Sequence, residues 1–267
     1  MKFLLQCVTI ALLIQVQLAF GDPKDNKIHS MSKKAINVLK FVKDYLPQNP
    51  IVLEAGAYNG VDTKIISTLW PKGRIHAFEP VPELYEVLKK STSSVKNITC
   101  YKTALSDKKG TASFYVSEYE SNPGIPGASG SLLAPKEHLK YATDVKFPKK
   151  ITVDTITIDQ WAKHYKIEYI DFMWLDMQGH ELTALKHSLS ILPTVKLIYT
   201  EVEFVKAYDG QAVYQEVKEW LNEQGFEVLA IDFNEKVASL GDAIPVGQGD
   251  NWYGNVLFIR KDLQKSN

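Results

Sequence analysis

Two glycines and a glutamate that follow a short apolar segment are the first residues with an evident chemical use. Residues 51–53 are apolar, Glu54 comes next, and Gly56 and Gly60 begin a turn that leads into a helical pattern. Glycine lets the backbone turn sharply and approach a ligand closely, and the N–H groups at a helix start attract anions. The spacing is not that of the dinucleotide fingerprint G-x-G-x-x-G. The turn therefore predicts nucleotide binding only together with later strands, and a purely structural turn is the alternative.

A second acidic residue stands where a ribose would be recognised. Residues 74–78 form a short strand that ends in Glu79 and Pro80. In a doubly wound sheet, an acidic residue about 20 positions after the glycine turn lies at the tip of the second strand and accepts hydrogen bonds from ribose hydroxyls. Because Pro80 disfavours a helical conformation at the preceding residue, we expect the Glu79 carboxylate in an extended segment. The alternative is an exposed loop glutamate.

Three further polar residues follow later strands. The apolar segment 169–175 ends in Asp176, His180 begins the next helical pattern, and the segment 197–204 carries Glu201. Ligands of open α/β sheets bind beyond the carboxyl ends of the strands, so we expect these three side chains there. His180 is the expected general base because the ordinary pKa of histidine lies near neutral pH. A surface histidine and a divalent metal ion held by the three residues are the alternatives, although no spacing argues for a metal.

Predicted strands alternate with predicted helices, which is typical of an α/β domain. The expected strands are residues 51–53, 74–78, 97–106, 111–116, 151–158, 169–175, 197–204, 226–231 and 255–260. The expected helices are residues 33–46, 61–69, 82–90, 135–141, 159–164, 181–189 and 213–222. This order delivers the acidic residues to one edge of a mostly parallel sheet.

A long irregular stretch interrupts this alternation. Residues 122–130 are rich in Pro, Gly, Ser and Asn, which form turns. Loops of this length are commonly functional lids, so we predict a lid-like insertion over residues 121–150. Its first part, residues 121–131, is expected to close over the acceptor of the reaction.

Composition sets the class of protein and limits its partners. The chain has 267 residues, 45% of them hydrophobic, which is enough for one well-packed domain. Lys+Arg and Asp+Glu are both 31, so no overall charge favours nucleic acid or an anionic membrane. We therefore expect a small-molecule partner and no nucleic acid.

The N-terminal residues have the pattern of an export signal. Met1 and Lys2 precede an apolar run, and Ala19-Phe20-Gly21 fits a cleavage site with small residues. We predict a signal peptide over residues 1–21, a linker over 22–32 and one domain over 33–262, in a protein that is secreted, periplasmic or lumenal. Three glutamines interrupt the apolar run, which counts against a permanent transmembrane helix. An uncleaved membrane anchor is the alternative.

Five motifs in a fixed order resemble the FkbM-type family of S-adenosylmethionine-dependent methyltransferases over about residues 50–260. They are Leu53–Gly60, Phe78–Glu83, Ala104–Asp107, Thr155–Asp159 and Leu175–Glu181. The resemblance implies a Rossmann-like class I methyltransferase fold. This α/β fold has a seven-stranded, mostly parallel sheet with an antiparallel last strand and helices on both faces.

The resemblance also implies a cofactor, S-adenosyl-L-methionine, and a reaction. The methionine end would lie at the glycine turn, the ribose at Glu79 and the adenine near residues 104–107. The residues expected to bind the cofactor are Glu54, Gly56, Ala57, Tyr58, Asn59, Gly60, Glu79, Pro80, Ala104, Leu105, Ser106 and Asp176. Reported members methylate hydroxyl oxygens, so the implied reaction is O-methylation of a small molecule or carbohydrate, with His180, Asp176 and Glu201 as catalytic residues.

Two residues depart from the family pattern. Trp174 stands where the family usually has Lys, and Gln178 where it often has Glu. Strand alternation puts Trp174 on the side of Asp176, so we expect the indole to change the charge and room of the site. These departures leave a catalytically inactive binding protein as one alternative. A nicotinamide-dependent oxidoreductase is another, and the closing strands 226–231 and 255–260 count against it.

Overall fold

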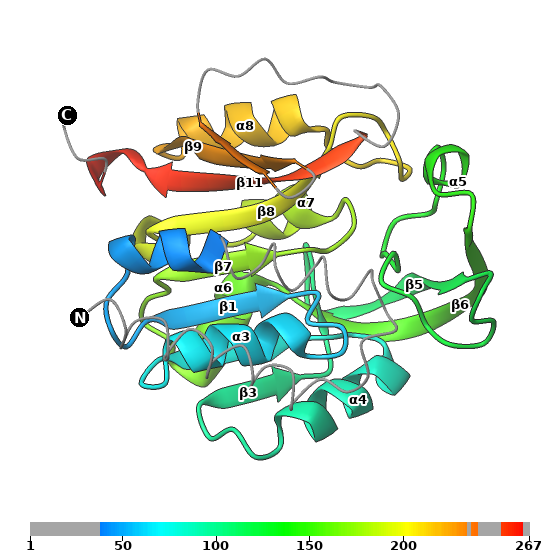
Figure 1. Cartoon of the computed structure of the whole chain (residues 1–267), viewed down its shortest axis with the longest axis horizontal. Coiled ribbons are helices and arrows are strands. Elements are labelled where there is room, and N and C mark those ends of the chain that lie inside the picture. The colour runs from blue at the N-terminus through cyan, green and yellow to red at the C-terminus, as the bar shows by residue number, and fades with distance from the viewer. Residues whose placement is uncertain (1–37, 234–235, 240–251, 264–267) are drawn as a thin grey trace, which may run out of the picture.

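The structure is a computed structural model that describes residues 38–233, 236–239 and 252–263 (Figure 1). The predicted signal peptide and linker lie outside the described residues and stay predictions, as does the boundary of the domain at residue 33. The expected first helix is described from Val38 onward and ends in the 3₁₀ turn η1 (Lys43–Tyr45). Within the described residues, no helix has both the length and the apolar character needed to span a bilayer.

The main sheet has the strand order β10-β9-β11-β8-β7-β1-β2-β3. Its strands are β1 (Ile51–Ala55), β2 (Arg74–Phe78), β3 (Ile98–Tyr101), β7 (Phe172–Leu175), β8 (Leu197–Glu203), β9 (Phe226–Phe233), β10 (Lys236–Ser239) and β11 (Tyr253–Arg260). Neighbours from β3 to β8 pair in parallel, and β11 is antiparallel to both β8 and β9. This confirms the predicted seven-stranded sheet with an antiparallel last strand. The short strand β10 extends it by a hairpin with β9.

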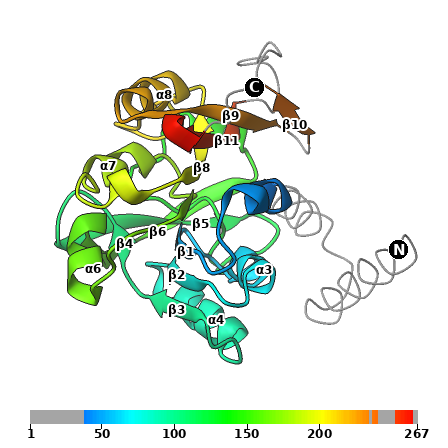
Figure 2. The same cartoon turned by 90° about the vertical axis from the view of Figure 1, so that its left-hand side faces the viewer.

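Helices cover both faces of this sheet, as the edge-on view in Figure 2 shows. They are α3 (Val61–Leu69), α4 (Pro82–Thr92), α6 (Ile158–Tyr165), α7 (Glu181–Lys186) and α8 (Tyr214–Glu223). Alternate residues of the buried strands feed two apolar cores. Leu53 and Met173 pack on the side of α6, α7 and α8, whereas Val52 and Phe172 pack on the side of α3. Burial on both faces explains why these strands are apolar throughout.

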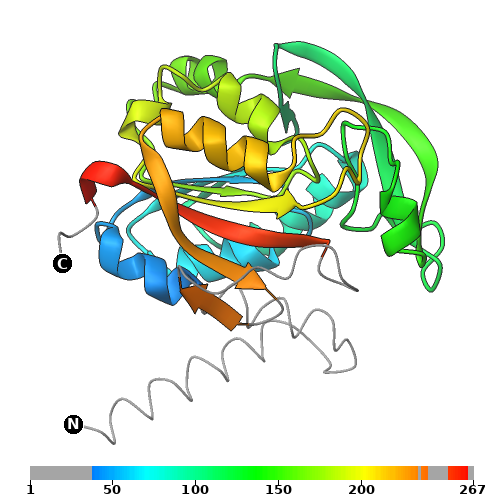
Figure 3. The ribbon, with the colours of Figure 1, turned by 90° about the horizontal axis from the view of Figure 1, so that it is seen from above.

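The predicted third strand, residues 97–106, is wrong as a single element. The chain turns after β3, and β4 (Ala104–Leu105) leaves the main sheet to pair with β6 (Val145–Ile156). Together with β5 (Gly110–Tyr119) these strands form a second, three-stranded sheet. Figures 1 and 3 show β5 and β6 reaching beyond the carboxyl ends of the central strands. The second sheet therefore forms one wall at the edge where ligands of such folds bind.

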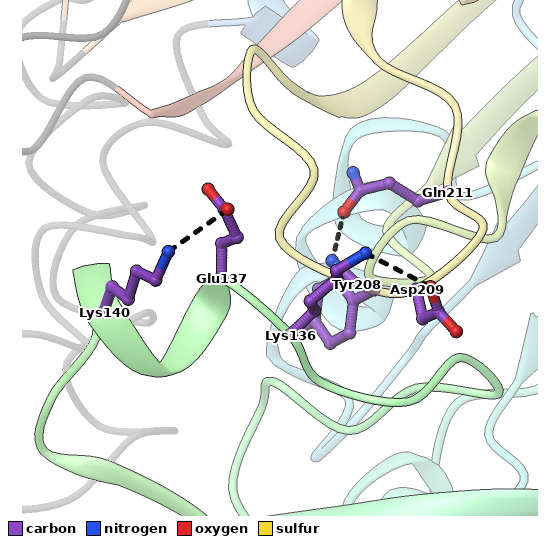
Figure 4. Close-up of polar contacts among 6 residues, drawn as sticks. All are labelled: Lys136, Glu137, Lys140, Tyr208, Asp209 and Gln211. Atoms are coloured by element: carbon purple, nitrogen blue, oxygen red, sulfur yellow. Dashed lines mark hydrogen bonds and ion pairs between the residues drawn. The ribbon is translucent and has the colours of Figure 1, made fainter.

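Backbone hydrogen bonds hold the predicted insertion against the rest of the protein at several points. Ser131 and Tyr115 exchange backbone hydrogen bonds of 2.8 and 3.1 Å, and the helix α5 (His138–Tyr141) follows. Just before this helix, the N–H groups of Lys136 and His138 donate to the Ala207 carbonyl at 2.8 and 2.9 Å. Figure 4 shows the side chains at this junction, among them the ion pair of Lys136 with Asp209, whose charged atoms are 3.6 Å apart. The irregular segment is thus already folded over the edge of the main sheet, and β6 begins inside the predicted insertion, at Val145.

Candidate active site

A cavity of about 340 Å³ lies where the tips of β1, β2 and β7 face β5 and the loop after it. The volume is within the range of about 300–1,000 Å³ that is usual for small-molecule sites. The predicted site residues that line it are Glu54, Gly56, Ala57, Tyr58, Asn59, Glu79, Pro80, Ala104, Leu105, Asp176 and His180. Gly60, Ser106 and Glu201 were also predicted, but they are not among its lining residues.

The two glycines of the turn serve the packing of the protein itself. A Cβ on Gly56, whose φ is 84°, would lie 1.8 Å from the carbonyl oxygen of Asp176. A Cβ on Gly60, at φ 80°, would lie 2.7 Å from Ser91 Oγ on α4. The close approach that we expected toward a ligand is therefore made to neighbouring protein atoms. Gly56 fixes the distance between the ends of β1 and β7, where Asp176 begins.

Glu54 is a buried carboxylate at the end of β1. Only 1% of its surface is exposed, and Oε2 has no hydrogen-bond partner. Burial raises the pKa of Glu54 well above its ordinary value, and the nearby carboxylates of Asp62 and Asp176 raise it further. An unpartnered buried acceptor on a cavity wall fits a ligand that brings a hydrogen-bond donor or a positive charge.

Glu79 is held at the tip of β2 by two backbone groups. Tyr58 N donates to Oε2 at 3.0 Å, and Val81 N donates to Oε1 at 2.8 Å. Burial raises the pKa of Glu79 to about 8. Each carboxylate oxygen accepts more than one hydrogen bond, so the same oxygens remain able to take ligand hydroxyls. The predicted ribose acceptor is thus oriented by the turn that precedes it by 21 positions in sequence.

His180 stands at the start of α7 with one ring nitrogen engaged. Its Nε2 lies 3.0 Å from Ser106 Oγ, and Ser106 Oγ donates to Asp107 Oδ1 at 3.1 Å. Because a hydroxyl has one proton, Nε2 is then the donor to Ser106 and Nδ1 carries the lone pair. Nδ1 is buried without a partner, and burial lowers the pKa of His180 to about 4. The imidazole is therefore neutral at pH 7, and Ser106 orients it instead of lining the cavity.

Gln178 joins the third predicted acid to the site. Its Nε2 donates to Asp176 Oδ1 at 2.8 Å and to Glu201 Oε1 at 2.6 Å, and its Oε1 accepts from Tyr208 Oη at 2.9 Å. This orientation of the amide matches its neighbours, because carboxylates only accept and the tyrosine hydroxyl donates. Glu201 therefore reaches the cavity through Gln178 and Asp176. Sequence reasoning treated Gln178 only as a departure and missed this bridge.

The expected effect of Trp174 on the site is wrong. Its side chain is 7% exposed and packs on Tyr199 with ring centroids 4.4 Å apart. It belongs to the core cluster on the α3 side with Phe172, and it is not among the residues lining the cavity. The indole lies on the α3 side of β7, and one further residue of the strand, Leu175, separates Trp174 from the edge.

Sequence reasoning also missed the wall formed by the second sheet. Phe114, Val116, Ser117 and Tyr119 of β5 line the cavity together with several residues of the segment 121–132. Strand propensity indicated residues 111–116, but no local pattern showed that this strand returns to the edge of the main sheet. Among the residues that the structure describes, no three His, Cys, Asp or Glu side chains are grouped to hold a metal ion.

The strand order and the acidic tips of β1 and β2 define a class I S-adenosylmethionine-dependent methyltransferase. The methyltransferase FkbM domain family matches residues 54–228 of the chain. The chain therefore belongs to the FkbM methyltransferase family. S-adenosyl-L-methionine is accordingly its cofactor, and the family match favours it over the nicotinamide cofactor of the alternative.

Two relatives show the range of similarity. The 2-O-methyltransferase NoeI of Sinorhizobium fredii is 29% identical over 182 residues, which are 68% of this chain and 74% of the relative. Methyltransferase sdnD of Sordaria araneosa is 30% identical over 168 residues, which are 53% of this chain and 61% of the relative. The chain thus spans about three quarters of the first relative and less than two thirds of the second.

Solved structures are similar to this chain at low sequence identity. Fibrillarin of Aeropyrum pernix, crystallised with natively bound S-adenosyl-L-methionine, is 14% identical, with 85% of this chain and 76% of that chain covered and a TM-score of 0.44. A SAM-dependent methyltransferase from Aquifex aeolicus is 14% identical, with 85% and 91% covered and a TM-score of 0.42.

Proposed function

We propose that this protein transfers a methyl group from S-adenosyl-L-methionine to a hydroxyl oxygen of a small molecule or sugar. The observation that carries the proposal is the neutral imidazole of His180, a residue that lines the same cavity as Glu54 and Glu79 and whose Nδ1 has no hydrogen-bond partner. A base beside a donor site is what an alcohol acceptor requires, because its proton must leave as the oxygen attacks. The name of the relative NoeI, a 2-O-methyltransferase, supports oxygen as the acceptor atom.

The residues of the chain divide this work among them. Bound S-adenosyl-L-methionine supplies an electrophilic methyl group. Glu79 would accept hydrogen bonds from the ribose hydroxyls. The carboxyl groups of Glu54 and Asp176 lie at the tips of β1 and β7, where a cationic ligand would favour their ionised forms. His180 takes the acceptor proton at Nδ1, while its Nε2 stays fixed by Ser106. Gln178 Nε2 holds the Asp176 side chain in position through its hydrogen bond to Oδ1.

Calorimetry followed by a transfer assay tests the proposal. The purified protein is titrated with S-adenosyl-L-methionine and, separately, with NAD(P). It is then incubated with methyl-labelled donor and pooled sugars, phenols and hydroxylated lipids. We expect donor binding, no NAD(P) binding, and label in an alkali-stable methyl ether. Donor binding without transfer to any pool would favour the inactive binding protein, and binding of NAD(P) alone would overturn the proposal.

We also propose that the protein is exported and that its mature form begins near Asp22. The support is the apolar run and the small residues Ala19 and Gly21. N-terminal sequencing of protein from the native host tests this. An intact Met1 in a soluble cytosolic fraction would overturn it, and an intact Met1 in the membrane fraction would favour the uncleaved anchor.

A further inference from the structure

Strand β5 changes the direction of its side chains at one residue. Phe114 and Val116 line the cavity, as alternate residues of a strand do. The pairing of β5 with β6 then shifts between Val116 and Glu118, and Ser117 and Tyr119 line the cavity in place of residue 118. Such a bulge adds one residue and re-aims the side chains that follow. As a result the strand presents Ser117 and Tyr119 to the cavity, where its regular alternation would have placed the charged side chain of Glu118.

The bulge is held by contacts on both sides. The Ser117 carbonyl accepts from Gly127 N at 2.7 Å. Glu118 points away from the cavity, where its Oε2 accepts from Gly124 N at 2.7 Å. Both contacts come from the loop that follows β5. The bulge and the loop therefore define each other's position, and the direction of Ser117 does not depend on a bound ligand.

The Ser117 hydroxyl is buried without a partner. The residue is 0% exposed, and its Oγ makes no hydrogen bond within the described residues. A Cβ at position 127 would lie 3.1 Å from this oxygen, so the glycine there keeps the space beside it open. Burying an unpaired hydroxyl costs roughly 1–3 kcal/mol, which argues that a ligand group completes it.

The charges around the cavity restrict what that ligand can be. Carboxylates line it at several points: Glu54, Asp62, Glu79, Asp144 and Asp176. Among the described residues that line it, none is Lys or Arg. An anionic acceptor would therefore find no Lys or Arg side chain among these lining residues to pair with its charge, which is unfavourable in a partly desolvated site. The wall made by β5 and its loop instead alternates uncharged polar groups, such as Asn122, with apolar ones, such as Ile125.

We propose that this wall is the acceptor subsite and that it binds an uncharged carbohydrate, with Ser117 Oγ bonded to one of its hydroxyls. The inference rests on the proposed function and narrows its substrate class. A sugar ring offers hydroxyls at its edge and C–H groups on its faces, which matches the alternation of Ser117, Tyr119 and Asn122 with Phe114 and Ile125. A phenol would need only one polar partner. Sugar acids and sugar phosphates are disfavoured, because no Lys or Arg among the described lining residues could pair with their charge.

Pooled acceptors test the substrate class. Methyl-labelled S-adenosyl-L-methionine is offered with a pool of neutral mono- and disaccharides, a pool of uronic acids and sugar phosphates, and a pool of phenols. We expect label in the neutral pool and none in the acidic pool. Label in the acidic pool, or no label in the neutral pool, overturns this inference. Label in phenols alone overturns it too but leaves the proposed O-methylation standing, whereas a failure to bind the donor defeats the proposed function.

Ser117→Ala tests the residue, with Ser113→Ala as the matched control on the exposed part of the same strand. For the labelled sugar, Ser117→Ala is expected to raise KM roughly 3- to 10-fold, the value of one neutral hydrogen bond. The kcat and the donor Kd should not change. Without acceptor, the Tm should stay equal or rise, because an unpaired buried hydroxyl has been removed. An unchanged KM, or a Tm that falls well below that of the control, overturns the role of Ser117.

Discussion

The two halves of the cavity are built in different ways. At the tips of β1 and β2, main-chain groups set the positions: a glycine packed on a carbonyl, and two N–H groups that hold the Glu79 carboxylate. Opposite them, a bulged strand and its loop present side chains whose directions depend on pairing between β5 and β6. Donor binding therefore depends on the positions of backbone atoms, which tolerate little change. Acceptor recognition rests on side chains, which are replaced more easily.

The largest difference between the halves should appear when a methyl group is added to a glycine in each. Gly56→Ala places a Cβ 1.8 Å from the Asp176 carbonyl oxygen, whereas Gly124→Ala, at φ 81°, meets nothing within 4 Å. We expect Gly56→Ala to cost more than about 4 kcal/mol of unfolding free energy and Gly124→Ala about 1 kcal/mol from backbone strain alone. Chemical denaturation measures both. Equal costs would mean that the turn at β1 is not tied to β7 as described.

The next largest effect concerns the base between the halves. His180→Ala should lower turnover by about 10²–10⁴-fold and leave the donor Kd nearly unchanged. Because the pKa of His180 is lowered to about 4, its imidazole is unprotonated across pH 6 to 9, so it should add no inflection to the rate profile there. His187→Ala, an exposed histidine at the end of the same helix, is the control. Full activity of His180→Ala across pH 6 to 9 would move the role of base to Asp176 or Glu201.

A smaller effect is expected in the donor half alone. Glu79→Gln keeps the shape of the side chain but directs an amide N–H toward one of the two backbone donors. The donor Kd should rise by roughly 10- to 100-fold, the value of a charged hydrogen bond of about 1.5–3 kcal/mol. Glu83→Gln is the control, since it removes an exposed ion pair with Lys149, a kind of contact that contributes little. A donor Kd unchanged by Glu79→Gln would show that the ribose lies elsewhere.

Glu79 should also make stability depend on pH. Its folded pKa is about 8 against an ordinary value of 4.5, so the folded protein keeps a proton that the unfolded chain releases. This contribution to stability is full below about pH 4.5 and is lost as the pH rises through about 8. Without donor, the unfolding free energy should therefore fall across this window, by at most about 1.4 kcal/mol per pH unit for one group. Glu79→Gln should reduce that slope, and an unchanged slope would assign it to other buried carboxyls.

The smallest effect is expected at the contact that joins the halves. Tyr58, at the glycine turn, donates from Oη to the Pro126 carbonyl of the loop at 3.3 Å. Tyr58→Phe should cost no more than about 1 kcal/mol of unfolding free energy and raise the KM of donor and acceptor by similar, small factors. Tyr85→Phe on α4 is the control. A large loss of turnover in Tyr58→Phe would mean that this hydrogen bond couples the two halves more strongly than its length indicates.

The donor half was predictable from sequence because its signals are local. The apolar strand, Glu54, the glycine turn and Glu79 lie within the 29 consecutive residues 51–79, and their spacing alone indicates the tips of two neighbouring strands. The same reasoning explained the glycines incompletely, since nothing in the spacing shows that Gly56 packs on Asp176. That contact joins segments 120 positions apart.

In the acceptor half, the loop over residues 121–131 was expected from its composition, whereas the wall formed by β5 was not, for a physical reason. The change of side-chain direction at Ser117 depends on how β5 pairs with β6. The order of apolar and polar residues in the sequence does not show where such a bulge occurs. Residues 104–105 continued the apolar pattern of β3, yet pairing with β6 drew them into the second sheet. The role of Gln178 depends on its hydrogen bonds with Asp176, Glu201 and Tyr208. Glu201 and Tyr208 are distant in the sequence, so the motif around Gln178 does not reveal these bonds.

The anchoring of the loop after β5 has a consequence for how such proteins diverge. Backbone hydrogen bonds fix the loop to β5 at Gly127 and Ser131, while the turn at residues 120–125 is bonded mainly to itself and to Glu118. Insertions and exchanges in that turn leave the main sheet untouched, because surface turns with few outside contacts tolerate them. Substrate preference can therefore evolve there, at a site where new residues reach the acceptor without disturbing the machinery that binds the methyl donor.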